Sequence, residues 1–250
     1  MRVIAKIFGH FGLLTAGFLA LAPAQAAAAC GDLSYEGASY TVCDVAVGED
    51  LRLFLSGPDG VWGSFAAVNE TLAAMGQQLG FAMNAGMYQP DRSPVGLFVQ
   101  DGVAQSRIVT SDGPGNFGLL PNGVFCVGDT FAVIESRSYA ATVPHCRYAS
   151  QSGPMLVIGG KLHPKFLRGS ASKFIRNGVG VSADGATATF AISNDPVNFH
   201  AFARLFRDAL GLPNALYFDG KISRLYALEL GRNDLGFPMG PIIGTVVPKG

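Results

Sequence analysis

Acidic residues are missing from positions 136–183, although the same stretch carries seven basic ones. The seven are Arg137, Arg147, Lys161, Lys165, Arg168, Lys173 and Arg176. Because the whole chain is formally neutral, this asymmetry is local. A cationic segment with Gly and hydrogen-bonding side chains suits an anionic ligand, above all a phosphate. Solvation of the surface explains any single Lys equally well, so the prediction depends mainly on Arg176 in its Asn-Gly context.

Histidine is scarce, and the common catalytic motifs are absent. Only His145, His163 and His200 follow the N-terminal segment, and they lack metal-ligand spacing. The sequence has no Walker loop, no G-x-S-x-G elbow and no H-E-x-x-H helix. A G-x-G-x-x-G pattern at 113–118 contains Pro114 and precedes no expected helix, so we interpret it as a loop. These absences argue against a triad hydrolase, a zinc peptidase and a dinucleotide-binding protein.

The N-terminus has the features of a signal peptide over residues 1–26. Arg2 and Lys6 precede an apolar run at 11–22, and Ala24-Gln25-Ala26 offers a cleavage site. The run is too short to span a membrane comfortably. We therefore expect a periplasmic or secreted protein without a stable membrane span.

Net charge and length limit the partners and the size of the fold. Removal of Arg2 and Lys6 leaves 16 basic and 18 acidic residues, a net charge of −2, which excludes a generally basic nucleic-acid binder. The mature chain of about 220 residues can bury one good-sized core. No repeat or linker divides it, so we expect a single compact domain; the oligomeric state is left open.

Four cysteines follow the leader, which suggests disulfides in an exported chain. Three connectivities are open; we favour Cys30–Cys43 and Cys126–Cys146, because each pair closes a short loop between candidate strands. No pair has Cys-x-x-Cys spacing, which disfavours a zinc site. Lipidation of Cys30 is the alternative to its disulfide.

Periodicity and turn signals predict an α+β fold with a mixed, mostly antiparallel sheet and two main helices. Apolar residues recur at helical spacing over 66–79 and over 197–210. Hairpin turns are expected at Gly48-Glu49, Asp101-Gly102, Gly128-Asp129 and Asp184-Gly185. The predicted domain covers 38–230, and the Gly/Pro-rich tail, 231–250, is expected to be irregular.

Four segments place polar residues beside Gly at the end of an apolar strand, where a ligand can approach the backbone closely. They are 83–88, 149–155, 174–180 and 215–223. Each alone is explained as well by a structural turn. Together they predict one converging site.

The residue types in these segments suit a phosphorylated sugar. Arg176 can hold a phosphate bidentately, and Asn84, Gln151, Ser152 and Asn177 can bind sugar hydroxyls or phosphate oxygens. Asp219 follows four apolar residues, so we expect a partly buried carboxyl suited to acid–base chemistry. The structural alternative for Asp219 is a turn former in an Asp-Gly hairpin.

The same motifs resemble the phosphodiester glycosidase family, which includes the lysosomal mannose-6-phosphate uncovering enzyme of eukaryotes. The motifs are Asn84-Ala85-Gly86-Met87, Gly115-Asn116-Phe117 with Pro121-Asn122-Gly123-Val124-Phe125, Gln151-Ser152-Gly153-Pro154-Met155, Arg176-Asn177-Gly178-Val179-Gly180 and Ala215-Leu216-Tyr217-Phe218-Asp219-Gly220. The resemblance covers roughly residues 38–230 and is closer to the short exported bacterial members.

This resemblance implies hydrolysis of a sugar-1-phosphodiester, with free sugar and a phosphomonoester as products. It implies catalytic roles for Arg176 and Asp219. The substrate-binding candidates are Asn84, Gly86, Gln151, Ser152, Asn177 and Gly220. A second carboxyl group is usual in glycosidases, and Glu135, Asp101 and Asp195 are the candidates. No cofactor or metal is required, although Asp219 with Asn side chains and carbonyls can hold a divalent cation.

Three other functions remain open. A phosphodiesterase would cleave the P–O bond instead of the bond to the sugar. A non-catalytic envelope module would bind phosphorylated glycan through the same Arg and Asn side chains. A protein-docking surface would use the cationic stretch; convergence of the four segments in one pocket would argue against it.

Overall fold

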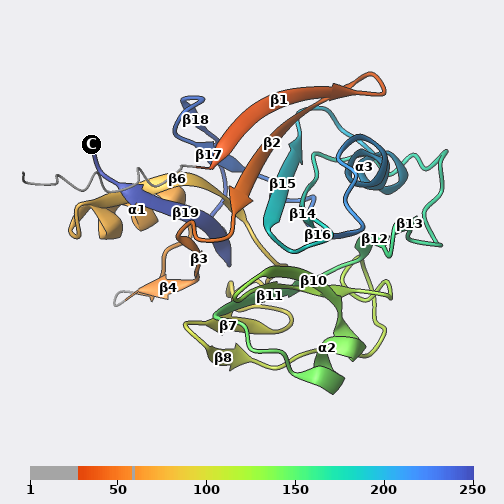
Figure 1. Cartoon of the computed structure of the whole chain (residues 1–250), viewed down its shortest axis with the longest axis horizontal. Helices are drawn as coiled ribbons and strands as arrows, with labels where there is room; N and C mark the ends of the chain where they lie inside the picture. The colour runs from red at the N-terminus through yellow and green to blue at the C-terminus, as the bar shows by residue number, and fades with distance from the viewer. Residues whose placement is uncertain (1–27, 58–59) are drawn as a thin grey trace, which may run out of the picture.

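The computed structural model describes residues 28–57 and 60–250. The predicted signal peptide, 1–26, lies outside these residues. Three antiparallel sheets form the body of the molecule, and the helices lie at its periphery (Figure 1). The α+β prediction is confirmed.

The largest sheet has seven strands. In spatial order they are β1 (Ala29–Tyr35), β2 (Ala38–Ala46), β15 (Thr187–Ser193), β14 (Asn177–Val181), β16 (Asn214–Asp219), β12 (Met155–Ile158) and β13 (Lys161–Leu162). Two neighbouring interior strands, β14 and β16, carry the Arg176 and Asp219 motifs at one end. The Asp184-Gly185 turn between β14 and β15 is confirmed.

Two five-stranded sheets complete the fold, and we name each after one strand. The β9 sheet contains β10 (Phe131–Glu135), β9 (Gly123–Val127), β11 (Tyr148–Ser152), β7 (Phe98–Gln100) and β8 (Val103–Ser106). The β6 sheet contains β18 (Arg232–Asn233), β17 (Leu225–Ala227), β6 (Gln77–Asn84), β19 (Ile242–Pro248) and β3 (Leu51–Phe54). A short pair, β4 (Ser56–Gly57) and β5 (Gly60–Val61), follows β3.

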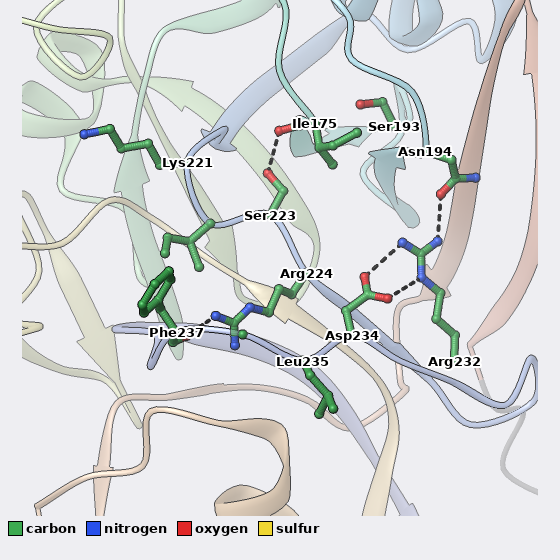
Figure 2. A pocket seen from close by; sticks show the side chains of 12 residues that line it. Ile175, Ser193, Asn194, Lys221, Ser223, Arg224, Arg232, Asp234, Leu235 and Phe237 are labelled. Carbon is green, nitrogen blue, oxygen red and sulfur yellow. Dashed lines mark hydrogen bonds and ion pairs between the residues drawn. The ribbon is translucent and has the colours of Figure 1, made fainter.

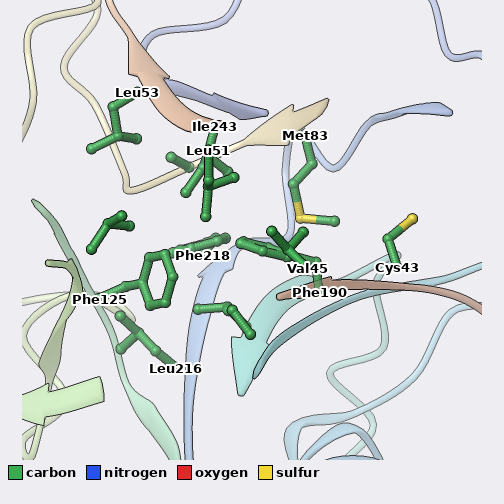
Figure 3. Close-up of a cluster of buried hydrophobic side chains, with 14 of the residues drawn as sticks. Cys43, Val45, Leu51, Leu53, Met83, Phe125, Phe190, Leu216, Phe218 and Ile243 are labelled. Atoms are coloured by element: carbon green, nitrogen blue, oxygen red, sulfur yellow. The ribbon is translucent and has the colours of Figure 1, made fainter. Parts of the chain in front are cut away.

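The three sheets share one apolar core (Figure 3). Phe190 of the seven-stranded sheet lies against Phe81 of the β6 sheet and Phe125 of the β9 sheet, with ring centroids 4.9 and 5.7 Å apart. All three rings are fully buried. Burial of such side chains stabilises the fold by about 25 cal/mol for each Å² of apolar surface that is removed from water. This common core fixes the relative positions of the sheets and therefore of the strand ends around the site.

Each helix covers one sheet. They are α1 (Phe65–Ala73) on the β6 sheet, α2 (Ser136–Thr142) on the β9 sheet, and α3 (Phe199–Arg204), continued by the π-helix η1 (Leu205–Ala209), on the seven-stranded sheet. Helix α3 begins after Asn198, whose side chain accepts a hydrogen bond from the Ala201 amide. A Cβ at Gly180 would come within 2.8 Å of Phe206, so this glycine lets β14 approach the helix. The segment predicted as one helix over 197–210 is thus helical over most of its length, whereas α2 was not predicted.

The helix predicted over 66–79 is too long. Gly76 adopts a φ of 67°, a conformation that ends the helix, and β6 begins at Gln77. Leu79 suited a helical face by its spacing from Val68 and Leu72. Leu79 also alternates with Phe81 and Met83 at the spacing of a strand, and these residues are buried in β6.

The expected hairpin at Gly48-Glu49 is wrong, because the strands on either side belong to different sheets. Both edges of β2 are already paired, with β1 and with β15. The chain therefore turns at Gly48 and passes to the β6 sheet. The hairpins at Asp101-Gly102 and Gly128-Asp129 are confirmed.

The expected irregular tail over 231–250 is also wrong. Within it, β19 pairs with both β6 and β3 and occupies the interior of the β6 sheet. A Cβ at Gly244 would come within 2.5 Å of the Phe81 carbonyl oxygen. Glycine at this position therefore permits close packing of β19 against β6. The prediction of an irregular tail was based on the high Gly and Pro content, which usually weakens a strand.

Both favoured disulfides, Cys30–Cys43 and Cys126–Cys146, are present. The first joins β1 to β2, and the second joins β9 to the segment before β11. In this state the Cys30 sulfur is not available for a lipid. None of the helices in the described part of the chain is long and apolar enough to cross a membrane.

Candidate active site

The end of β6 and the middle of the seven-stranded sheet are joined by two buried asparagines. Asn84 Nδ2 donates to Asn177 Oδ1 at 3.2 Å, and Asn177 Nδ2 donates to the Asn84 carbonyl at 2.8 Å. Asn177 also accepts a hydrogen bond from the Asp219 amide at 3.2 Å, and Asn84 accepts one from the Arg224 amide at 3.0 Å. These side chains hold three chain segments together and thereby fix the backbone at Asp219.

A second set of contacts attaches the β9 sheet to the same place. The Ser152 hydroxyl donates to the Phe218 carbonyl at 2.9 Å, next to Asp219. The Gly86 amide donates to the Ser150 hydroxyl at 3.1 Å. A Cβ at Gly86 would come within 2.3 Å of the Gln151 carbonyl oxygen, so only glycine allows this approach. The predicted convergence of the four segments is therefore confirmed.

Gln151 is buried, and both of its amide atoms are engaged within the protein. Oε1 accepts hydrogen bonds from the Leu97 and Val109 amides at 3.0 and 2.9 Å. Nε2 donates to the Val109 carbonyl at 2.6 Å and to the Ser136 hydroxyl at 2.8 Å. The structure gives Gln151 a supporting role under the 97–109 segment in place of the predicted contact with substrate.

Arg176 is buried as a charged side chain without a counter-ion. It is 1 % exposed, and it forms no ion pair with any of the described residues. Nε donates to the Val197 carbonyl at 2.8 Å, and Nη2 donates to the Ser172 carbonyl at 3.1 Å. The guanidinium carbon lies 3.7 Å from the centroid of the Phe199 ring. Burial lowers the pKa of Arg176. The two carbonyls and the aromatic ring offset only part of the cost of burying a charge without a counter-ion, so this position can accept an anion.

The third guanidinium nitrogen, Nη1, is buried and makes no hydrogen bond of standard geometry in the described chain, although the Tyr217 hydroxyl is close enough to interact with Arg176. A Cβ added to Gly220 would lie 2.2 Å from the Tyr217 hydroxyl and 3.5 Å from Nη1, so these groups border the same space. Burial raises the pKa of Tyr217, while Arg176 and Asn116 oppose this shift. The unpartnered nitrogen thus points toward the Gly220 turn and a phenol that remains protonated.

Asp219 lies at the end of β16 on this turn. Its Oδ1 accepts hydrogen bonds from the Gly220 amide at 2.6 Å and the Lys221 amide at 2.9 Å. Burial raises the pKa of the carboxyl, although these amides partly oppose the shift. Asp219 therefore combines the turn-forming role with the raised pKa expected of an acid–base group. Asn177 is paired with Asp219 in register, so its neighbour Arg176 lies at the same end of the adjacent strands. The Arg176 side chain extends toward Phe199, whereas that of Asn177 extends toward Asn84.

The other six basic residues of the stretch 136–176 are all exposed. Arg137, for example, donates to the Thr110 carbonyl, and Arg147 pairs with Asp101. Of the seven, Arg176 alone is buried. The local excess of charge is thus mainly a solvated surface, and it contributes one guanidinium to the candidate site.

The three candidates for a second carboxyl group are engaged elsewhere. Glu135 caps α2 by accepting from the Ser138 amide at 2.9 Å. Asp101 accepts from the Tyr148 hydroxyl at 2.8 Å, and Asp195 accepts from the Ser39 amide at 2.8 Å. None of the three has a hydrogen bond to the Asn84, Asn177 and Asp219 cluster. Nor do the described residues contain any group of three or more His, Cys, Asp or Glu side chains that can hold a metal ion. The divalent cation stays an untested prediction.

Sequence reasoning missed two side chains that complete the site. Tyr217 faces Arg176 and Gly220, and a register shift between its pairing with Gly178 and that of Asp219 with Asn177 interrupts the period-two alternation of β16. Ser223 donates its hydroxyl proton toward the Asp219 and Ile175 carbonyls at 2.9 and 3.0 Å. Both residues lie in the segment 215–223, in which only Asp219 and Gly220 were predicted as site residues.

This chain is similar to known proteins in sequence and in fold. The sequence profile of the phosphodiester glycosidase family matches residues 77–237, which contain every predicted site residue. The uncharacterized protein YigE of Escherichia coli (strain K12) is 34 % identical over 180 residues, which cover 71 % of this chain and 70 % of that protein.

A solved structure has the same fold. It is the catalytic domain of zebrafish N-acetylglucosamine-1-phosphodiester alpha-N-acetylglucosaminidase, auto-inhibited by its pro-peptide. The two structures superpose with a TM-score of 0.61 over 87 % of this chain and 81 % of that one, at 13 % identity. At this identity the likeness concerns the fold.

Proposed function

This chain belongs to the phosphodiester glycosidase family, and on that premise we propose that it is an exported hydrolase acting on a sugar-1-phosphodiester. It releases the free sugar and leaves a phosphomonoester. The observation that carries the proposal is the buried guanidinium of Arg176, which has no counter-ion among the described residues and borders the turn at Gly220, the residue after Asp219. A phosphate is an anion that can supply the missing partner, and the carboxyl supplies acid–base chemistry next to it.

In the proposed reaction, a water oxygen attacks the anomeric carbon while Asp219 accepts a proton from that water. The bond between the anomeric carbon and the phosphate oxygen breaks, and the phosphate leaves with the electron pair. Arg176 stabilises the negative charge that grows on the leaving oxygen. Because phosphate leaves readily, this reaction depends less on a second carboxyl group than ordinary glycoside hydrolysis does.

Asn84, Asn177 and Ser152 support this chemistry by fixing the backbone around Asp219. Gly220 keeps the space in front of the Tyr217 hydroxyl and Arg176 free of a side chain. Since Nη1 is closed off from solvent, a phosphate reaches it only when the turn at Gly220 moves. We therefore include a small opening of this turn in the binding step.

A periplasmic or secreted location is part of the proposal. Two disulfides form between cysteines of the folded chain, and disulfides persist in oxidising compartments. They support export, as does the signal-peptide pattern at 1–26.

The test is incubation of the purified mature protein with a panel of sugar-1-phosphodiesters and measurement of free sugar. Release of free sugar is expected from at least one member. Binding without release of any product would support the envelope module, and release of a sugar phosphate would support the phosphodiesterase.

Labelled water separates the two enzymatic reactions independently of product chemistry. With ¹⁸O water, cleavage at the anomeric carbon places the label in the sugar. Cleavage of the P–O bond places it in the phosphate. Label in the phosphate would contradict the proposed glycosidase reaction.

A further inference from the structure

A cavity of about 490 Å³ lies next to the Asp219 turn and contains none of the predicted site residues (Figure 2). Its lining comes from the segment after the turn, from the loop after β18, and from the ends of β14 and β15. The residues used below are Lys221, Ser223, Arg224, Asp234, Leu235 and Phe237. The volume is that of a site for a small molecule.

The basic side chains in the cavity are not all neutralised. Arg232 forms two hydrogen bonds with the Asp234 carboxylate, at 3.0 and 2.9 Å. Arg224 is 7 % exposed, and within the described chain its guanidinium bonds only to the Phe237 carbonyl and has no carboxylate at ion-pair distance. Lys221 is exposed and likewise has no ion pair among the described residues. Two positive charges are thus left for a ligand.

One wall of the same cavity is apolar. Leu235 and Phe237 line it, yet they are 87 and 78 % exposed. Between them, Gly236 lies against Arg224, since a Cβ there would come within 2.7 Å of its Nη2. Figure 2 shows the Phe237 ring beside the Arg224 guanidinium. Large exposed apolar side chains grouped around a cavity are typical of binding sites.

The cavity is connected to the candidate active site through the backbone. The Ser223 hydroxyl donates to the Asp219 carbonyl at 2.9 Å, and the Arg224 amide donates to Asn84 Oδ1 at 3.0 Å. Lys221 and Arg224, which a ligand in the cavity would contact, follow Asp219 by two and five residues in the sequence.

We propose that this cavity is the aglycone subsite, and that it selects phosphodiesters whose aglycone has an anionic group joined to an apolar or aromatic surface. Lys221 and Arg224 bind the anionic group, and Leu235 and Phe237 contact the apolar part. The substrate class rests on the proposed hydrolase function, whereas the binding site itself does not. Lys221 and Arg224 favour an aglycone with an anionic group over a neutral aglycone, because charge-assisted hydrogen bonds are stronger than neutral ones.

The binding test uses phenyl phosphate as an amphiphilic anion and inorganic phosphate as the anion alone, both titrated calorimetrically into the mature protein. We expect phenyl phosphate to bind more tightly. Arg224→Gln, which keeps a donor for the Phe237 carbonyl, and Lys221→Ala should each weaken its binding about 10-fold. Phe237→Ser should reduce the preference for phenyl phosphate over inorganic phosphate.

Matched controls come from exposed residues away from the cavity. Lys161→Ala removes a lysine, and Leu167→Ser removes an apolar side chain that is 71 % exposed. Neither should change the affinity for phenyl phosphate. No binding by the parent protein, or equal weakening by the control variants, would overturn the subsite. Because Lys221 is exposed, its variant gives a result even where Arg224→Gln fails to fold.

The catalytic test compares two esters of one sugar-1-phosphate, a carboxyphenyl ester and a methyl ester. In the parent, the ratio of their kcat/KM values should favour the carboxyphenyl ester, and Lys221→Ala should lower that ratio about 10-fold. Hydrolysis with an unchanged ratio contradicts the subsite and leaves the hydrolase function standing. Loss of phenyl phosphate binding in the variants without hydrolysis of either ester contradicts the hydrolase function and leaves the subsite standing.

Discussion

Gln151 and Arg176 are equally buried, at 1 % exposure each, but they are buried in opposite ways. Gln151 satisfies both of its amide atoms with four hydrogen bonds inside the protein. Arg176 keeps a full charge with no counter-ion and leaves Nη1 without a partner in the described residues. A satisfied buried group contributes to stability, whereas an unsatisfied one lowers it. The difference separates a scaffold residue from one whose partner is a ligand.

The sharpest test of this contrast is Arg176→Met, which keeps much of the side-chain volume and removes the charge. We expect release of free sugar to fall at least ~100-fold, the scale of losing a group that stabilises charge in the transition state. The free energy of unfolding should change little, because removal of an unpaired buried charge is offset by loss of the hydrogen bonds to the Val197 and Ser172 carbonyls. Turnover assays and urea unfolding measure the two effects.

The matched control for this variant is Lys173→Ala, which removes an exposed charge from the same stretch. It should change neither quantity. If Arg176→Met were nearly as active as the parent, Arg176 would not belong to the mechanism.

Gln151→Leu tests the other side of the comparison. The change leaves the Leu97 and Val109 amides without their acceptor, so we expect unfolding to require about 2 kcal/mol less free energy. The folded fraction should keep its kcat, since Gln151 has no free atom for a substrate. Urea midpoints give the stability, and activity per folded molecule gives the second result. A large loss of kcat in the folded protein would restore Gln151 to the substrate site.

Asp219→Asn examines the raised pKa of the carboxyl. A raised pKa in the folded state means that this group favours folding at low pH and that the contribution is lost as pH rises through the raised value. Asp219→Asn should therefore be slightly more stable than the parent at pH 7, and the difference should shrink on acidification. Its pH–rate profile should lack the limb that belongs to Asp219 in the parent.

The outcome against this interpretation is a variant whose thermal stability and pH–rate profile both follow the parent's at every pH. Asp219 would then be only a turn former held by the Gly220 and Lys221 amides.

The smallest effect is expected from removal of divalent cations. If Arg176 alone neutralises the phosphate, dialysis against EDTA should change the rate less than about twofold. A large loss that is restored by a divalent cation would show that the charge of Arg176 is insufficient and that Asp219 holds a metal ion.

Local chemistry made much of the fold predictable. The turns at Asp101-Gly102 and Asp184-Gly185 contain residues with a positive φ, namely Asp101, Gly102 and Gly185. The turn at Gly128-Asp129 was predictable from residue types that are common in tight turns. The disulfides followed from short spacing between candidate strands. The convergence of the four polar segments was also predicted, from strand ends next to glycine.

The errors arose where distant strands decided the outcome. β19 depends on the backbone of β6 beside Gly244, and the turn at Gly48 depends on which edges of β2 are free. Similarly, nothing in the sequence near Gln151 shows that Leu97, Val109 and Ser136 surround its amide. Pairing partners of this kind are properties of the assembled sheets and cannot be obtained from a local pattern.

The position of β19 has a consequence for how the protein matures. This strand is synthesised after β6 and β3 and must enter between them. It is paired with Asn84, and the Pro241 carbonyl accepts from the Ala85 amide at 2.8 Å. A nascent chain that lacks residues 241–248 therefore has an incomplete β6 sheet and an unsupported Asn84. The support of Asn84 therefore depends on the last residues of the chain to be made, and the candidate site is complete only once β19 has entered its sheet.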